Sequence, residues 1–331
     1  MFPKVTIIIP IYNKKTYFSA LRECLLNQTF SDFECIFVDD GSTDGSGELC
    51  DNLCREDERF IVYHVRNAGV SNARNIGLKC AKGRYVTFID ADDTFHNEYI
   101  ENLYTCINQT DAKLVITSSI KVWSNSDKQI PIEVPFLGEV SMEKILPHFM
   151  KEQLNNGIFG FCWGKIMERD LLTNKFFDIN LKLAEDLSFY LSIYPDLDMI
   201  FFDNHPYYYY LQEAMNSSMQ KPDWEIDYLA QLKILLQIKK YLEIKKQLSG
   251  ENLKLLSSRI FDYVFFSIYY APKNSIVSMC SLINKYAINL EDTNHKRSSR
   301  QKLILTLYKH KMYHVISLLI RGLRRMKRVN Y

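Results

Sequence analysis

The stretch Tyr85–Phe95, YVTFIDADDTF, joins an uninterrupted apolar run to a cluster of three carboxylates. Its first five residues, YVTFI, are typical of a strand that is buried on both faces. Asp90, Asp92 and Asp93 follow within four positions. Because crowded like charges repel one another, this cluster favours a bound cation.

Strand and helix patterns alternate over roughly the first 120 residues. We expect strands at 5–11, 33–40, 59–65, 85–90 and 112–118. We expect helices at 16–28, after the turn 41–47, within 67–83 and at 97–109. This alternation predicts an α/β fold with a largely parallel sheet covered by helices on both faces.

The alternation weakens after Ile120. We expect a loop or an irregular hairpin over 121–140, a helical stretch from 141, a helix at 183–195 and a strand at 199–204. From Trp224 onward the pattern is almost entirely helical. The sequence therefore predicts an α/β domain over 1–220 and a helical region over 221–331.

Three of the predicted strands end in a polar segment. The candidate residues at these ends are Pro10, Tyr12 and Asn13 for the first strand, Asp39 and Asp40 for the second, and Asp90, Asp92 and Asp93 for the fourth. Ligand sites of parallel sheets lie at the carboxyl ends of the strands, so we expect these residues to meet there. One aspartate at a strand end is ordinary turn chemistry, whereas a carboxylate cluster suits Mg²⁺ or Mn²⁺. Such ions take few protein ligands and complete their shell with substrate phosphates, so a nucleotide diphosphate is the expected ligand.

The composition is that of a globular protein, with 47% hydrophobic and 24% charged residues. No apolar run reaches the ~18 residues that span a bilayer, and the N-terminal apolar stretch is too short for a secretory signal. Eight cysteines without a CxxC pair fit reduced thiols. We therefore expect a cytoplasmic protein.

The charge is distributed unevenly along the chain. Residues 293–331 carry eleven Lys and Arg and no Asp or Glu, which leaves 30 basic against 39 acidic residues elsewhere. The apolar residues of this tail recur at helical spacing, and most of the arginines fall beside that stripe: Met312, Val315, Ile316, Leu319, Leu323 and Met326 against Arg321, Arg324, Arg325 and Arg328. Such a helix suits an anionic membrane surface, and the alternative is a packed helix with a solvated basic face. No nucleic-acid-binding motif is present, so we expect no nucleic-acid partner.

Six segments within about residues 4–219 resemble, in order and spacing, the motifs of the family 2 glycosyltransferases. They are VTIIIPIYN, FVDDGSTDGS, RNAGVSNARNIGL, YVTFIDADD, WGKIMERDLL and AEDLSFYL. The resemblance implies the GT-A fold, a Rossmann-like and mainly parallel central sheet with helices on both faces. The helical C-terminal region departs from this compact core. Similar enzymes build bacterial capsule, lipopolysaccharide, exopolysaccharide or wall polymers.

The resemblance also implies roles for single residues on the donor side. Pro10, Tyr12 and Asn13 match the loop that borders the nucleotide. Asp39 matches the acid that contacts the uracil edge, with Asp40 beside it.

The remaining donor-side matches concern ribose, phosphates and metal. Asn67 and Arg74 match residues near the ribose and the phosphates. Asp90 and Asp92 match the acid pair that touches ribose and metal, and the metal contact falls on Asp92 or Asp93.

Asp186 matches the catalytic base of the ED motif. Taken alone, it would more often be an acid favoured by a helix dipole. The implied function is inverting, metal-dependent transfer from a nucleotide sugar, expected to be a UDP-sugar, to a saccharide hydroxyl. The expected acceptor is a lipid-linked capsule, lipopolysaccharide or exopolysaccharide intermediate, which would place the chain peripherally at the inner face of the cell membrane.

Two alternatives stay open. A sugar-phosphate nucleotidyltransferase would share the nucleotide and the metal, but usually opens with a Gly-rich basic loop that IIIPIYNKK does not supply. A non-catalytic, transferase-like scaffold of a polysaccharide assembly complex would keep the fold, and the intact DxDD and ED motifs argue against it.

Overall fold

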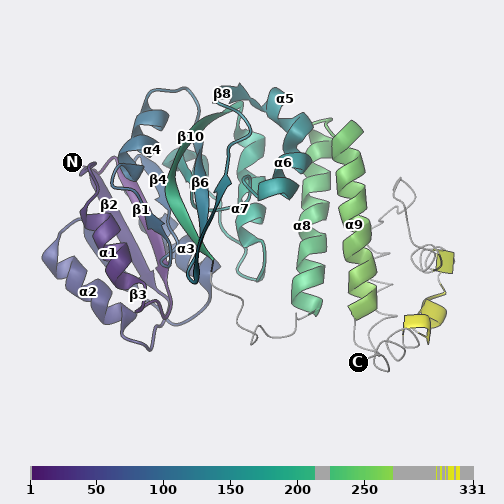
Figure 1. Cartoon of the computed structure of the whole chain (residues 1–331), viewed down its shortest axis with the longest axis horizontal. Helices are drawn as coiled ribbons and strands as arrows, with labels where there is room; N and C mark the ends of the chain where they lie inside the picture. The colour runs from purple at the N-terminus through teal and green to yellow at the C-terminus, as the bar shows by residue number, and fades with distance from the viewer. Residues whose placement is uncertain are drawn as a thin grey trace. The chain divides into compact units, whose positions relative to one another are not determined.

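The computed structural model describes residues 2–212 and 224–270, together with scattered residues between 303 and 320 (Figure 1). The chain divides into two compact units. The first comprises Met1–Leu181 and Glu185–Ser218, and the second comprises Lys182–Ala184 and Met219–Tyr331. The first unit contains the sheet. In the second, helices α8 (Trp224–Ile244) and α9 (Gly250–Tyr270) pack against each other.

Ten strands form one sheet within the described residues. They are β1 (Val5–Ile11), β2 (Phe33–Asp39), β3 (Phe60–His64), β4 (Tyr85–Phe88), β5 (Thr94–Phe95), β6 (Leu114–Trp123), β7 (Ser126–Ile132), β8 (Gly138–Ser141), β9 (Lys165–Glu168) and β10 (Met199–Gln212). The α-helices of the first unit are α1 (Phe18–Leu26), α2 (Ser46–Glu56), α3 (Val70–Cys80), α4 (Tyr99–Asn108), α5 (Met142–Ile145), α6 (Phe149–Asn156) and α7 (Glu185–Ile193).

The strand order is β3-β2-β1-β4-β9-β6-β10-β5, with β7 paired to β6 and β8 paired to β10. Strands β3, β2, β1 and β4 run parallel, which confirms the parallel sheet expected for the N-terminal part. Strands β6 and β10 are also parallel to each other. Strand β9 lies antiparallel between β4 and β6 and joins the two parallel groups.

Burial on both faces explains the uninterrupted apolar strands. In β2, Ile36 and Val38 pack with Ala73 of α3, whereas Phe37 faces Phe18 of α1 with ring centroids 6.1 Å apart. Successive side chains of a strand point to opposite faces, so α3 and α1 cover opposite sides of the sheet. Helix α3 lies close to the sheet, because a Cβ on Gly77 would come within 2.4 Å of the Ile8 side chain.

The C-terminal part of the sheet is more extensive than the sequence pattern indicates. The segment expected to be a loop or irregular hairpin contains β7, which pairs antiparallel with β6, and β8. Strand β10 runs to Gln212 rather than ending near 204, and strand β9 was not expected. The helix expected at 183–195 is α7.

Part of the predicted amphipathic tail is described. Within it, Ile316 and Ile320 are buried, whereas Met312 and Leu318 are exposed. Residues 293–302 and 321–331, with most of the basic side chains of the tail, lie outside the described residues. Among the helices that the structure describes, none has the length and apolar character needed to cross a bilayer.

Candidate active site

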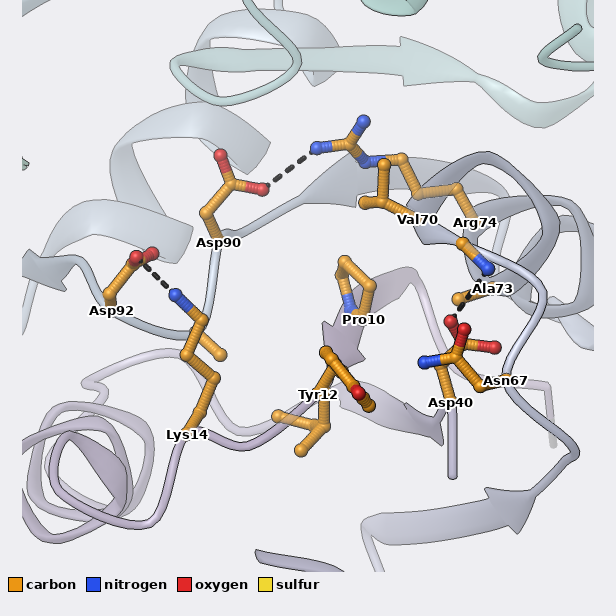
Figure 2. A pocket seen from close by; sticks show the side chains of 13 residues that line it. Pro10, Tyr12, Lys14, Asp40, Asn67, Val70, Ala73, Arg74, Asp90 and Asp92 are labelled. Carbon is orange, nitrogen blue, oxygen red and sulfur yellow. Dashed lines mark hydrogen bonds and ion pairs between the residues drawn. The ribbon is translucent and has the colours of Figure 1, made fainter. Parts of the chain in front are cut away.

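A pocket of about 550 Å³ lies where β1, β2 and β4 reach their carboxyl ends (Figure 2). It is lined by Pro10, Ile11, Tyr12, Lys14, Asp40, Asn67, Gly69, Val70, Ala73, Arg74, Asp90, Ala91 and Asp92. Seven of the predicted donor-side residues are in this set: Pro10, Tyr12, Asp40, Asn67, Arg74, Asp90 and Asp92. The predicted residues Asn13, Asp39, Asp93 and Asp186 are not among the residues that line it.

Asn13 does not line the pocket and instead bonds to the loop after β2. Its backbone has φ 51°, a left-handed conformation that asparagine tolerates better than most residues. Its side-chain Oδ1 accepts from the backbone N–H of Thr43 at 2.9 Å, and its own N–H donates to Ser42 Oγ at 3.0 Å. The loop after β1 is therefore joined to the loop after β2.

Asp39 and Asp40 end strand β2 with opposite orientations. Asp39 accepts from the N–H of Ser42 at 3.0 Å and contacts His64 Nδ1 at 2.8 Å. Burial acts to raise the pKa of Asp39, but the hydrogen bonds from Ser42 and His64 outweigh it and lower the pKa. Asp40 accepts from the N–H groups of Ala68 and Gly69 at 2.8 and 2.7 Å. Asp40 is thus the member of the pair that lines the pocket.

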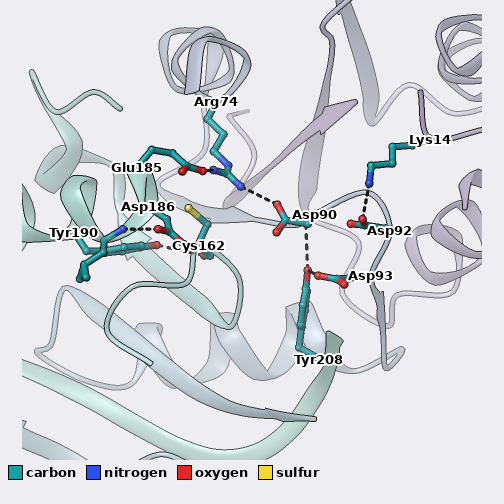
Figure 3. Close-up of polar contacts among 11 residues, drawn as sticks. Lys14, Arg74, Asp90, Asp92, Asp93, Cys162, Glu185, Asp186, Tyr190 and Tyr208 are labelled. Carbon is teal, nitrogen blue, oxygen red and sulfur yellow. Dashed lines mark hydrogen bonds and ion pairs between the residues drawn. The ribbon is translucent and has the colours of Figure 1, made fainter. Parts of the chain in front are cut away.

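A buried arginine connects the end of β4 to the start of α7 (Figure 3). Arg74 donates from one terminal nitrogen to Asp90 Oδ1 at 2.9 Å and from the other to Glu185 Oε1 at 3.1 Å. Its side chain is 6% exposed, and its buried Nε has no hydrogen-bond partner among the described residues. We call Asp90, Arg74 and Glu185 the Arg74 bridge.

The two other acids of the DADD segment have separate environments. Asp92 pairs with Lys14, whose Nζ lies 2.5 Å from Asp92 Oδ2. Asp93 is buried, and it accepts from the hydroxyl of Tyr208 at 2.6 Å and from the N–H of Leu211 at 2.8 Å. Both carboxylate oxygens of Asp93 therefore bind to strand β10 rather than line the pocket.

Asp186 lies in the first turn of α7, beside Glu185 of the Arg74 bridge (Figure 3). Its Oδ1 accepts from the N–H of Leu187 at 2.7 Å. Burial, and next the charge of Glu185, raises the pKa of Asp186 to about 6. A carboxylate with this pKa is largely ionised at neutral pH and still basic enough to accept a proton.

Asp186 shares this region with a buried lysine. Lys165 of β9 is 1% exposed, and its ammonium donates to the backbone carbonyl of Phe161. The same ammonium lies 4.7 Å from the ring centroid of Tyr190 on α7. Burial lowers the pKa of Lys165 to about 7.

The donor set at the strand ends fits a hard divalent cation. One oxygen of Asp90 is bonded to Arg74 and one oxygen of Asp92 to Lys14, so each carboxylate keeps an oxygen without a partner among the described residues. Mg²⁺ and Mn²⁺ are commonly held by one or two carboxylates together with substrate phosphates. No group of three His, Cys, Asp or Glu side chains in the described part of the chain could hold a metal by itself.

Comparison with known proteins adds a decisive match. The family model for glycosyl transferase family 2 matches residues 6–172, half of the chain. The chain belongs to glycosyl transferase family 2. The match runs from β1 through β9, so it includes the whole pocket and stops before α7.

Two bacterial proteins that are named as glycosyltransferases resemble the chain over part of their length. Glycosyltransferase GlyA of Streptococcus pneumoniae is 32% identical over 190 residues, which are 55% of this chain and 27% of that protein. The uncharacterized glycosyltransferase EpsJ of Bacillus subtilis is 30% identical over 224 residues, 67% of this chain and 64% of that protein. The chain thus spans less than two thirds of the length of either relative.

Solved structures show the same architecture. The crystal structure of Staphylococcus aureus TarS residues 1–349 in complex with UDP-GlcNAc matches with a TM-score of 0.64. The match covers 97% of this chain and 92% of that chain at 20% sequence identity. This likeness confirms the GT-A fold that the sequence motifs of family 2 predict.

One functional candidate of this family 2 pocket was not predicted from the sequence. Lys14 directly follows Tyr12 and Asn13, and its ammonium reaches the acids after β4. The sequence signal for Lys14 is a basic residue in the loop after the first strand, which is expected to meet the acids that follow the fourth strand.

Proposed function

We propose that this family 2 chain is an inverting, metal-dependent glycosyltransferase that moves a sugar from a nucleotide-sugar donor to a saccharide hydroxyl. The observation that carries the proposal is the Arg74 bridge, which holds the ED motif of α7 beside the acids at the end of β4. A donor site and a candidate base are therefore held in one connected arrangement.

The strand-end pocket is the proposed donor site. Pro10, Tyr12 and Asn67 border the nucleotide. We assign the contact with the uracil edge to Asp40, which lines the pocket, in place of Asp39, for which we expected it. A divalent ion held by Asp92 with Asp90 would stabilise the charge that builds on the leaving diphosphate. We take UDP as the nucleotide, a choice supported by the UDP-GlcNAc bound to TarS.

Asp186 is the proposed base. It accepts the proton of the acceptor hydroxyl as that oxygen attacks the anomeric carbon, and the bond from that carbon to the diphosphate breaks. A base and a leaving group on opposite sides of the sugar lead to inversion. The raised pKa of Asp186 supports this role, because general bases work best when their pKa lies near the operating pH.

The proposed acceptor is a lipid-linked intermediate of a bacterial surface polysaccharide, reached from the cytoplasmic face of the membrane. The basic residues of 293–331 support a peripheral contact with anionic lipid. Flotation with anionic liposomes should fall when Arg324 and Arg325 are both replaced by glutamine. Equal flotation of the variant and the wild type would contradict the membrane contact.

The experiment that tests the activity is hydrolysis of a panel of UDP-, GDP- and dTDP-sugars, with Mn²⁺ and with EDTA. We expect release of free UDP, dependence on Mn²⁺ and loss of turnover in Asp186→Asn. Release of pyrophosphate from a nucleoside triphosphate and a sugar phosphate would instead identify a nucleotidyltransferase. Unchanged turnover in EDTA would remove the metal from the proposal.

A further inference from the structure

The ammonium of Lys14 forms an ion pair with Asp92, one of the carboxylates that line the pocket. Lys14 Nζ lies 2.5 Å from Asp92 Oδ2, and the two side chains are 30% and 29% exposed (Figure 2). One of the two carboxylate oxygens of Asp92 thus already has a cationic partner. Partly exposed ion pairs are weak and exchange readily, so a stronger anion can compete for the ammonium.

The backbone of Lys14 is fixed, whereas its side chain is long and adaptable. Its N–H donates to Ser46 Oγ at 2.8 Å, and the neighbouring Asn13 is held by the loop after β2. The ammonium lies between Asp92 and the ring of Tyr17, whose centroid is 5.4 Å away. If the ammonium changes its ion-pair partner, only the lysine side chain has to move. This side chain is a flexible stem of four carbons.

Of the basic side chains that line the pocket, Lys14 is the one that can pair with an incoming diphosphate. Three carboxylates line it, from Asp40, Asp90 and Asp92, and the two basic side chains are Lys14 and Arg74. Arg74 is buried and already donates to two carboxylates of the Arg74 bridge. A diphosphate that enters this acidic pocket needs positive charge, and Lys14 can supply it by turning away from Asp92.

We propose that Lys14 is a donor-binding residue that exchanges Asp92 for the diphosphate of the nucleotide sugar, which frees Asp92 for the divalent cation. The inference deepens the proposed function and rests on it. In the donor-free chain Lys14 competes with the cation for Asp92. In the donor complex the ammonium and the cation neutralise the diphosphate together.

The test is titration calorimetry on the full chain with Mn²⁺ alone, with UDP in EDTA and with pyrophosphate in EDTA. In Lys14→Met we expect Mn²⁺ alone to bind about two- to fivefold tighter, because the competing ion pair is gone. We expect UDP and pyrophosphate in EDTA to bind about tenfold weaker, because a charged hydrogen-bond donor is lost. Misfolding would weaken both kinds of binding, so the opposite signs exclude it.

Two further variants complete the design. Lys14→Arg keeps the charge and should stay close to wild type in all three titrations. Lys15→Met removes the neighbouring charge of the same loop, which does not line the pocket, and should also behave as wild type. Unchanged UDP binding in Lys14→Met, or Mn²⁺ binding that is not tighter, overturns the exchange while the proposed function stands. A wild-type chain that binds neither UDP nor pyrophosphate, in Mn²⁺ as well as in EDTA, overturns both.

Discussion

Arg74 on α3 and Glu185 on α7 form an ion pair of 3.1 Å although 111 residues separate them in the sequence. The second terminal nitrogen of Arg74 holds Asp90 at 2.9 Å. Because the guanidinium is a rigid planar fork, it fixes the two carboxylates relative to each other. The acids after β4 and the first turn of α7 are thereby held in one arrangement.

Replacing Arg74 with methionine should destabilise the fold by about 3–5 kcal/mol, because two carboxylates lose their buried counter-ion. Urea denaturation measures this loss. Arg84→Met is the matched control, since Arg84 is 68% exposed and pairs with Glu168 at 3.4 Å. We expect the control to change stability by at most about 1 kcal/mol. A loss in Arg74→Met as small as the one expected for the control would show that the Arg74 bridge does not stabilise the fold.

Replacing Asp186 with asparagine should lower turnover of the donor by a factor of about 10²–10⁴, the usual contribution of a general base. Binding of UDP should persist, because the pocket residues are unchanged. Asp196→Asn, which alters an exposed aspartate paired with Lys175, serves as the control and should keep wild-type turnover. Loss of UDP binding in Asp186→Asn would indicate a structural effect instead.

The pH dependence of turnover should reflect the raised pKa of Asp186. A base acts in its deprotonated form, so kcat/KM should fall as the pH drops through about 6 and reach a plateau above it. An unshifted aspartate would lose activity only near pH 4. A pH–rate profile between pH 4.5 and 8 distinguishes the two, and a flat profile over that range would argue against Asp186 as the base.

Asp92 and Asp93 should differ in their importance for metal. Asp92→Asn should reduce the gain in UDP affinity on adding Mn²⁺ by about tenfold or more, as expected for a lost ligand. Asp93→Asn should leave this gain unchanged, because both oxygens of Asp93 are bound by Tyr208 and Leu211. Titration of UDP with and without Mn²⁺ compares the variants. The reverse ranking would assign the metal to Asp93.

Asp93 should also make the stability depend on pH. Burial, and next the charge of Asp90, raises the pKa of Asp93 to about 8, far above its value of about 3.9 in an unfolded chain. The folded state therefore holds this proton more tightly, and the resulting stabilisation is full below about pH 4 and lost as the pH rises through 8. Asp93→Asn should flatten the decrease in the free energy of unfolding between about pH 5 and 8. Parallel curves for both proteins would contradict the assignment.

The N-terminal strands could be predicted because burial on both faces leaves an uninterrupted apolar run, as in β1 and β2. Strand β9 offers no such pattern. It has four residues, KIME, one of which is the buried Lys165, and it forms because β4 and β6 pair with it on either side. Pairing of this kind depends on tertiary context and not on local preference.

Strand β10 shows a second limit of sequence patterns. The apolar run ends at Phe202, and the polar residues 203–205 with Pro206 after them indicate an end to the strand, since proline cannot donate in a ladder. The structure places Pro206 between Asp203 and Tyr208, where the register with β6 shifts, and the strand continues to Gln212. Tyr208, which binds Asp93, belongs to the continuation that the pattern does not predict.

In the site, motif spacing identified the strand-end acids but not the direction of each side chain. Asp39 and Asp40 are adjacent in the sequence, and alternation along a strand sends their carboxylates to different neighbours. Which of them faces a ligand depends on where His64 and the Ala68–Gly69 backbone lie. That information requires the three-dimensional arrangement.

The hydrogen bonds between Asn13 and the Ser42–Thr43 turn have a consequence for the thermodynamics of recognition. Ordering a loop around a ligand normally costs conformational entropy, which is subtracted from the affinity. Here the two loops that flank the proposed nucleotide position are already hydrogen-bonded to each other. Donor binding should therefore require little ordering of these two loops. The side chain of Lys14 is the part that we expect to move on binding.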